Sequence, residues 1–269
     1  RHRMQVEPLA AFSVALSTAD RGSLLHQALN TLWGDIGDSA TLHALDAVRE
    51  QQIVQGAVMS AIATIPGHQQ RKLGAAYWRL EEARLCALLR EWLAVERQRS
   101  EFTVAGRELD MTLDLARLQI RLRVDRVDEL PGGGRLIIDY KSGRSSVQDW
   151  MGDRPARPQL LLYSIAEPGA VAGLAFATVR ARECRFTGLG TVAAAPGIAT
   201  KLSAAAAPLD GNGWAELNEH WRSTLERLAQ DYVSGVAQVD PLTPSSCTWC
   251  GLQSLCRIET EPASDGETA

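Results

Sequence analysis

The sequence lacks several features that would assign it to a large class of proteins. It has no apolar run of about eighteen residues, the length that a membrane-spanning helix requires. It has no Gly-x-x-x-x-Gly-Lys-Ser/Thr phosphate loop and no internal repeat. These absences argue against a membrane-embedded chain, ATP use through a phosphate loop, and a repeat architecture.

Cysteine and positive charge are also scarce. Five cysteines among 269 residues do not make the disulfide framework of a small secreted domain. The formal net charge of -4 argues against a broadly basic surface, but affinity for phosphate depends on local patches. One local excess is either a modest DNA footprint or a set of solvated surface charges: Arg121, Arg123, Arg126, Arg135, Lys141, Arg144, Arg154 and Arg157.

The order of patterns predicts one large domain in which helices precede a sheet and more helices follow. A hydrophobic content of 45% is enough for a full core in a chain of this length. Helices are predicted at 20–34, 42–63, 70–99, 155–167 and 213–234, and strands near 101–125, 135–141 and 172–187. A Gly/Ala/Pro-rich loop is predicted at 187–208, and a disordered tail at 260–269.

One predicted hairpin carries the strongest chemical signal. Residues 118–124 alternate apolar and polar side chains, and Pro131-Gly-Gly-Gly predicts a turn before the apolar strand at 136–138. Side chains at i and i+2 share one face of a strand, so Asp139 and Lys141 point together while Tyr140 points away. Pairing of the two strands would bring Asp125 towards Asp139.

This grouping suits the hydrolysis of phosphodiester bonds. Two adjacent carboxylates repel unless a cation lies between them, and oxygen ligands with open water positions suit Mg²⁺ or Mn²⁺. Lys141 is a compact charge that can orient water or stabilise a transition state. The alternative is a surface hairpin with ordinary solvated charges, because Asp-x-Lys alone is a weak motif.

The wider set of residues resembles a known family. Asp125, Asp139 and Lys141, followed by Gln159-Leu-Leu-Leu-Tyr163 and preceded by Arg21-Gly-Ser-Leu-Leu-His26, resemble the RecB-like branch of the PD-(D/E)XK nuclease superfamily. The resemblance implies an α/β fold with a restriction-endonuclease-like core, in which helices flank a central mixed sheet. Its parts would be an N-terminal helical layer (about 1–100), a catalytic core (about 101–187), and a C-terminal helix with a cysteine segment (about 211–259).

The resemblance also implies roles for individual residues. The metal ligands would be His26, Asp125, Asp139 and the carbonyl of Tyr140, and the catalytic set would be Asp125, Asp139, Lys141, Gln159 and Tyr163. Glu108 matches a frequently acidic position and has less weight, and Leu122 replaces a common glycine. Without the resemblance, His26 is a structural residue beside an apolar helix stripe. Gln159 and Tyr163 then share one helix face, either at an interface or with Tyr163 as a capped core residue.

Cys247, Cys250 and Cys256 form a second chemical signal. Three clustered thiols at this spacing are typical metal ligands, although zinc sites and cubane clusters usually need four. Similarity to AddB-type proteins implies a 4Fe-4S cluster whose fourth cysteine lies upstream. The start Arg1-His-Arg-Met resembles residues just after that cysteine, so we expect a fragment with an incomplete cluster. Cys86 and Cys184 could replace the missing ligand, but buried hydrophobic roles suit them better.

The resemblance thus implies a metal-dependent DNase, an exonuclease on single-stranded or unwound DNA ends. It would be the C-terminal domain of a longer DNA repair and recombination protein, with a helicase-nuclease partner subunit and no membrane contact. The thiols and this chemistry favour the cytoplasm. Two alternatives stay open: a catalytically silent DNA-binding or complex-assembly module, and a compact exonuclease of the kind used in CRISPR spacer acquisition.

Overall fold

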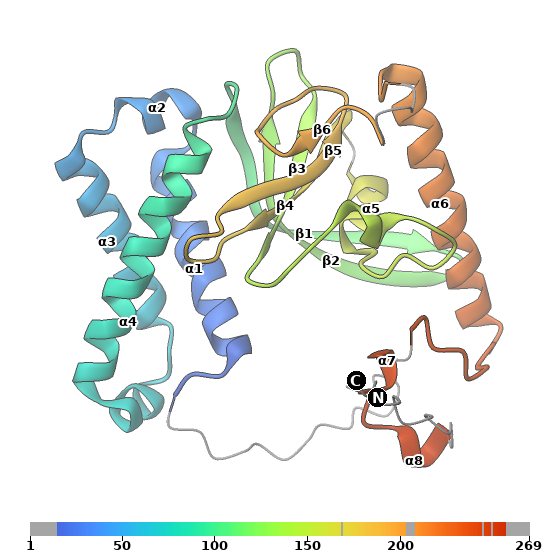
Figure 1. Cartoon of the computed structure of the whole chain (residues 1–269), viewed down its shortest axis with the longest axis horizontal. Helices are drawn as coiled ribbons and strands as arrows, with labels where there is room; N and C mark the ends of the chain where they lie inside the picture. Colours follow the sequence, from blue (N-terminus) through green and yellow to red (C-terminus); the bar gives the residue numbers. More distant parts are fainter. Residues whose placement is uncertain (1–14, 168, 203–207, 244, 249, 257–269) are drawn as a thin grey trace, which may run out of the picture.

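The computed structural model describes residues 15–167, 169–202, 208–243, 245–248 and 250–256. Helices lie on both sides of a central six-stranded sheet, with α1 to α4 on one side and α5 and α6 on the other (Figure 1). This arrangement confirms the predicted α/β class, including the N-terminal helical layer. The start at Arg1 and the tail at 260–269 lie outside the described residues.

The helical layer contains α1 (Thr18–Ile36), α2 (Ser39–Ala44), α3 (Ala47–Ala63) and α4 (Gly67–Glu96). The prediction of a single helix at 42–63 is wrong. Its first part belongs to α2, and a new helix begins after Asp46, whose carboxylate accepts a hydrogen bond of 2.7 Å from the backbone N–H of Arg49. The helix predicted at 70–99 begins earlier and bends at Gly74, where φ is 78°.

The sheet has the order β1-β2-β3-β4-β5-β6. The strands are β1 (Thr103–Leu115), β2 (Leu118–Glu129), β3 (Arg135–Lys141), β4 (Val171–Thr178), β5 (Arg185–Gly190) and β6 (Ile198–Ala199). The β3–β4 and β5–β6 pairs are parallel and the other neighbours are antiparallel. The sheet is therefore mixed, as predicted.

Each of the two long segments predicted to be strand contains two strands. The segment 101–125 contains a tight turn at Ala116 and Arg117, which have φ of 45° and 69°. Positive φ at both central residues is typical of hairpin turns, but such turns usually contain glycine or asparagine, so the pattern gave no signal. The segment 172–187 is divided by a turn after β4. The loop predicted at 187–208 contains the end of β5 and all of β6.

The second helical side begins with the short 3-10 helix η2 (Val147–Trp150) and α5 (Gln159–Ala166). The predicted helix at 155–167 therefore begins later, directly after Pro158. The C-terminal part consists of α6 (Gly211–Val233), α7 (Ser245–Thr248) and α8 (Gln253–Cys256).

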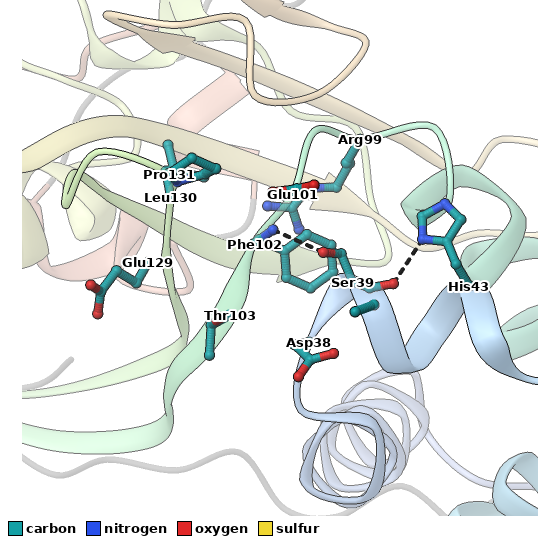
Figure 2. A pocket seen from close by; sticks show the side chains of 11 residues that line it. Asp38, Ser39, His43, Arg99, Glu101, Phe102, Thr103, Glu129, Leu130 and Pro131 are labelled. Carbon is teal, nitrogen blue, oxygen red and sulfur yellow. Dashed lines mark hydrogen bonds between the residues drawn. The ribbon is translucent and has the colours of Figure 1, made fainter.

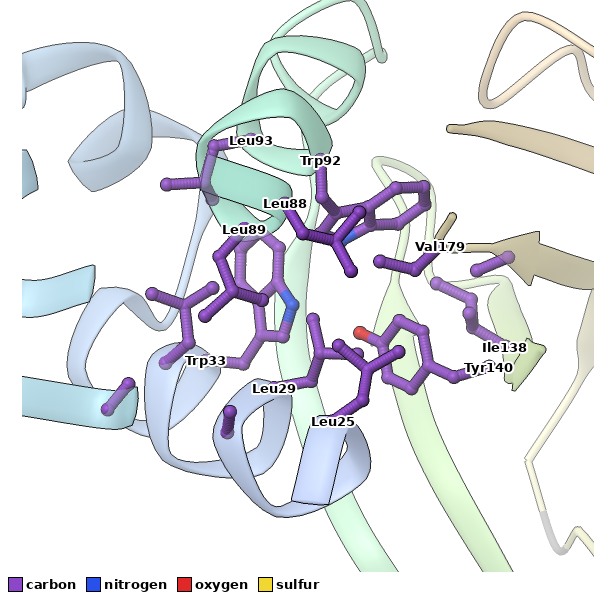
Figure 3. Close-up of a cluster of buried hydrophobic side chains, with 14 of the residues drawn as sticks. Leu25, Leu29, Trp33, Leu88, Leu89, Trp92, Leu93, Ile138, Tyr140 and Val179 are labelled. Atoms are coloured by element: carbon purple, nitrogen blue, oxygen red, sulfur yellow. The ribbon is translucent and has the colours of Figure 1, made fainter. Parts of the chain in front are cut away.

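A hydrophobic cluster lies on each side of β3. Ile138 and Tyr140 pack with α1 and α4, among Trp33 and Trp92 (Figure 3). Ile137, one residue away, packs in the second cluster with Trp150, Trp221 and Phe176. Because successive side chains point to opposite faces, β3 is held between the helical layer and α5–α6. The end of β3 therefore has a well-defined position, which matters for the residues that follow.

None of the helices in the described part of the chain is both long and apolar enough to cross a membrane.

Candidate metal centre and catalytic site

The candidate site lies where β2 and β3 separate. The ladder between them ends at the pair Arg126 and Ile138. Beyond this pair, towards lower numbers in β2 and higher numbers in β3, β2 pairs only with β1 and β3 pairs only with β4. Asp125 and Asp139 are next in register at this fork, and the backbone N–H of Tyr140 donates a 2.8 Å hydrogen bond to Asp125 Oδ2. The fork therefore holds the carboxylate of Asp125 directly beside the backbone of β3.

Two further elements bring ligand types to Asp125. His26 comes from α1, and its Nδ1 lies 3.3 Å from Asp125 Oδ1. Glu108 comes from β1, and ligand atoms of His26, Glu108 and Asp125 all lie within 4.8 Å of one another. These residues line a pocket of about 520 Å³ together with Arg123 of β2. The helical layer thus places His26 over the fork, as the sequence suggested.

Glu108 is the site residue that the sequence indicated least clearly. Its backbone has φ of 45°, a left-handed conformation that is costly for a residue with a side chain. Arg123 Nε lies 2.6 Å from Glu108 Oε2. No short motif links Glu108 to the aspartates, so its membership of the group depends on the pairing of β1 with β2.

Asp139 is fully buried and has an unusual environment. Its Oδ2 lies 2.6 Å from Lys141 Nζ, while its Oδ1 has no hydrogen-bond partner among the described residues. Burial raises the pKa of Asp139 to about 6; the charge of Asp125 adds to this, and Lys141 opposes it. Asp139 is outside the group of three residues within 4.8 Å, but its unpartnered oxygen is the kind of atom that a cation would satisfy.

The environment of His26 favours positive charge at this site. Burial lowers the pKa of His26, but hydrogen bonding to Asp125 and the charges of Asp125, Asp139 and Glu108 outweigh burial, so its pKa is raised. The same negative charges of Asp125, Asp139 and Glu108 would attract a divalent cation. His26 must be neutral to act as a ligand, so proton and metal compete here.

Gln159 and Tyr163 hold Lys141 through a chain of hydrogen bonds. Lys141 Nζ donates to Gln159 Oε1 at 3.1 Å, and Gln159 Nε2 donates to the hydroxyl of Tyr163. That hydroxyl donates in turn to the carbonyl of Arg123 at 2.5 Å. Tyr163 is 2% exposed and belongs to the second hydrophobic cluster, so its side chain supports Gln159 from inside the protein.

The side chain of Tyr140 points away from the carboxylates, as strand alternation predicts. Its hydroxyl accepts a hydrogen bond of 3.3 Å from Arg126 Nη1, and its ring meets that of His26 edge-on at 6.0 Å. Only its backbone is therefore available at the fork, and the predicted role of its carbonyl as a ligand stays a prediction.

The predicted arginine footprint is smaller than expected. Arg126 is fully buried, so its assignment to a surface patch is wrong. Arg135 pairs with Glu167, Arg154 with Asp240 and Arg157 with Asp149. Arg123 is exposed but pairs with Glu108, and Arg121 and Arg144 are the other exposed arginines of this set besides Arg154.

The cysteine segment forms a separate region. Cys247, Cys250 and Cys256 line a pocket of about 510 Å³, but among the described residues they do not form a group of ligand atoms within 4.8 Å. Cys86 and Cys184 pack against the first hydrophobic cluster, which agrees with a buried hydrophobic role.

A larger pocket, of about 900 Å³, lies at the opposite end of β3. It is lined by Glu129, Leu130 and Pro131, where β2 enters the hairpin turn, and by His43 and Phe102 (Figure 2). None of the predicted catalytic, metal-binding or cysteine residues lines it, so it is separate from the fork.

Comparison with known proteins bears directly on this geometry. The family model of the PD-(D/E)XK nuclease superfamily matches residues 1–257. The chain belongs to the PD-(D/E)XK nuclease superfamily. Membership implies nuclease activity with a divalent metal and a DNA substrate, and together with the mixed sheet it confirms the restriction-endonuclease-like fold.

Other comparisons add little to this assignment. The crystal structure of SSO0001 is similar to this PD-(D/E)XK chain, with 14% sequence identity and a TM-score of 0.35 over 95% of this chain and 89% of that one. A search of curated proteins finds no match.

The residues at the fork fit a divalent cation. Carboxylate oxygens of Glu108 and Asp125 and one imidazole nitrogen of His26 are already gathered, and such donors suit first-row and alkaline-earth dications. The buried Oδ1 of Asp139 supplies a further oxygen that no described protein group satisfies. These donor atoms are thus consistent with membership of a superfamily of metal-dependent nucleases.

Proposed function

We propose that this chain is a Mg²⁺- or Mn²⁺-dependent deoxyribonuclease that hydrolyses phosphodiester bonds at the fork between β2 and β3. The observation that carries the proposal is the buried Asp139, whose Oδ1 has no partner among the described residues while Lys141 contacts its Oδ2. A carboxylate in this state is costly unless a cation compensates its charge. The ligand atoms of His26, Glu108 and Asp125 lie close enough together to hold one.

Each residue at the fork would have a separate role in the reaction. When bound, the cation polarises the scissile phosphate and lowers the pKa of a water. Lys141, held by Gln159 and Tyr163, orients the attacking water and stabilises the negative charge that develops on the phosphate oxygens. Asp139 sets the position of Lys141 through their 2.6 Å contact.

We further propose a finer assignment from the motif set. The spacing of His26, the Asp-x-Lys strand and the Gln159–Tyr163 helix supports the RecB-like branch and an exonuclease acting on single-stranded or unwound DNA ends. The chain would be the C-terminal nuclease domain of an AddB-type repair and recombination protein in the cytoplasm, beside a helicase-nuclease partner. Cys247, Cys250 and Cys256 would be three ligands of a 4Fe-4S cluster that needs a fourth cysteine.

Cleavage of end-labelled DNA tests the proposal. The parent protein is expected to degrade single-stranded DNA with Mn²⁺ or Mg²⁺, and Asp139→Ala and Lys141→Ala are expected to abolish cleavage while circular dichroism shows both variants folded. Product ladders from 5′- and 3′-labelled strands distinguish exonuclease from endonuclease action. A parent that binds metal and DNA but does not cleave would instead indicate a silent binding module.

A further inference from the structure

A second pocket, of about 260 Å³, opens beside the candidate metal centre at the ends of two parallel strands. β3 and β4 run parallel and end at Lys141 and Thr178, which are partners in the ladder. Ser142 follows the first strand and Arg180 follows shortly after the second, and both line the pocket. Ligands of open α/β sheets characteristically bind outside the carboxyl ends of such strands.

Three arginines from three separate elements line this pocket. Arg21 comes from α1, Arg84 from α4 and Arg180 from the turn after β4, and all three are exposed. No carboxylate is among the described residues that line it. The hydroxyls of Thr18 and Ser142 add neutral donors. Outside the lining, Glu183 pairs with Arg180 at 3.3 Å and Glu81 pairs with Arg84, so part of the positive charge is compensated. The pocket still gathers three guanidinium groups, whose free N–H donors match the geometry of phosphate oxygens.

Two of the arginines are positioned from behind the pocket. Glu81 is 3% exposed and contacts Arg84, with 2.9 Å between Nε and Oε2. Arg21 is hydrogen-bonded to Tyr77. These contacts use only part of the five N–H donors of each guanidinium. The apolar wall contains Leu25, Leu88 and Val179, which belong to the first hydrophobic cluster (Figure 3).

The pocket is adjacent to the fork. Gly22 lines both this pocket and the one that contains His26, Glu108 and Asp125, and a Cβ at Gly22 would meet nothing within 4 Å. Ser142 directly follows Lys141 in the chain. A nucleic acid whose scissile phosphate lies at the fork would therefore place a neighbouring phosphate near the three arginines.

We infer that the pocket lined by Arg21, Arg84 and Arg180 binds a non-scissile phosphate of the DNA substrate and so sets where the DNA strand is cut. The inference rests on the proposed function, because it takes DNA to be the substrate. The phosphate is either the terminal 5′-phosphate or an internal phosphodiester, since both present the same oxygens to arginine.

Binding without cleavage is the direct test. In EDTA, fluorescence anisotropy measures the Kd of a 3′-labelled oligo-dT, with and without a 5′-phosphate, for the parent, Arg21→Gln and Arg180→Gln. Each substitution is expected to weaken binding roughly tenfold at low salt, through a lost charged hydrogen bond. Each should also reduce the slope of log Kd against log salt by about 0.7, one phosphate contact on a single strand. Arg84 is left intact because its loss would strand the buried Glu81.

Arg49→Gln is the matched control, since Arg49 is exposed on α3 and lines neither pocket. It should leave the Kd and the salt slope unchanged. If both pocket variants lose affinity only for the 5′-phosphorylated strand, the pocket binds the terminal phosphate. An equal loss for both strands assigns it to an internal phosphodiester.

Unchanged Kd and salt slope in both pocket variants would overturn the inference. Cleavage with Mn²⁺ separates this result from a failure of the proposed function. A parent that cuts DNA while both pocket variants bind and cut like Arg49→Gln would disprove the phosphate pocket alone. A parent that neither binds nor cuts DNA would disprove both.

Discussion

Asp139 shows how one residue can be costly to the fold and useful to the site. Its carboxylate is removed from water, one oxygen lacks a partner among the described residues, and its pKa is raised to about 6. At neutral pH the group is nevertheless mostly charged. The metal-free protein therefore carries an unfavourable buried charge that a bound cation would relieve.

Asp139→Asn should separate these two effects. Without metal, the variant is expected to be more stable than the parent by roughly 1–3 kcal/mol near pH 7.5, because the raised pKa measures the cost of the charge. The stabilisation that Mn²⁺ gives the parent should largely disappear. Thermal melts in EDTA and in Mn²⁺ measure both changes. Asp114→Asn, at an exposed position on β1, should change neither, and a variant that melts below the parent in EDTA would contradict the argument.

Lys141→Gln should affect catalysis and leave metal binding intact. Lys141 contacts Asp139 at 2.6 Å and donates a hydrogen bond to Gln159. Its removal is expected to reduce kcat by about a hundredfold or more, the effect of losing one charge-stabilising donor. Calorimetric Mn²⁺ affinity should be equal or higher because a competing positive charge is gone. Equal losses in metal affinity and kcat would show that Lys141 only maintains the ligands.

At the scale of elements, α5 acts as a support for the end of β3. Gln159 at its start contacts Lys141, and Tyr163 one turn later is anchored on the backbone of β2 through the carbonyl of Arg123. On its opposite side, Ser164 donates a hydrogen bond of 2.7 Å to Asn218 of α6. The helix thus links Lys141 of β3 to β2 and to α6.

Tyr163→Phe tests this support. Loss of the hydroxyl should cost about 1 kcal/mol of stability and free Gln159, so that kcat falls while KM for DNA stays near the parent value. Ser164→Ala removes a comparable hydrogen bond from the same helix, facing away from the site. It should cause a similar loss in urea denaturation with unchanged kcat. A Tyr163→Phe variant with the parent kcat would rule out the positioning role.

At the scale of the whole molecule, a buried cluster of charges joins the helical layer to the sheet. Arg126 of β2 contacts Glu96 of α4 at 2.8 Å and Asp128 at 2.6 Å. Arg99, after α4, contacts both acids at 2.7 and 2.8 Å and stacks over Phe102. All four side chains are fully buried. The nearby acids hold the pKa of Arg126 above its usual range despite burial.

Glu96→Gln and Asp128→Asn should each destabilise the protein by about 3–5 kcal/mol, because each leaves two buried guanidinium groups sharing one carboxylate. Glu50→Gln is the comparison, since Glu50 pairs with Arg97 near the surface and its loss should cost under about 1 kcal/mol. Urea denaturation followed by tryptophan fluorescence measures the difference. Losses as small as that of Glu50→Gln would mean that the cluster does not hold the layers together.

Several features could be predicted from the sequence because they depend on neighbours in the chain. The alternation before Asp125, the Pro131-Gly-Gly-Gly turn and the i, i+2 relation of Asp139 and Lys141 are local, and the strands form as these patterns indicate. Helical periodicity likewise located α1 and α6. Boundaries failed where the local signal was weak, as at Asp46, or absent, as at the Ala116-Arg117 turn.

The sequence by itself thus determined the order of elements and the hairpin of β2 and β3, since strand and helix periods depend on adjacent side chains. Only the tertiary structure decided which distant residues meet. Glu108 joined His26 and Asp125 because β1 pairs with β2 at the fork, and Arg126 became buried because α4 covers that face of the sheet. Strand register and layer packing depend on contacts between residues far apart in the chain, which no local pattern encodes.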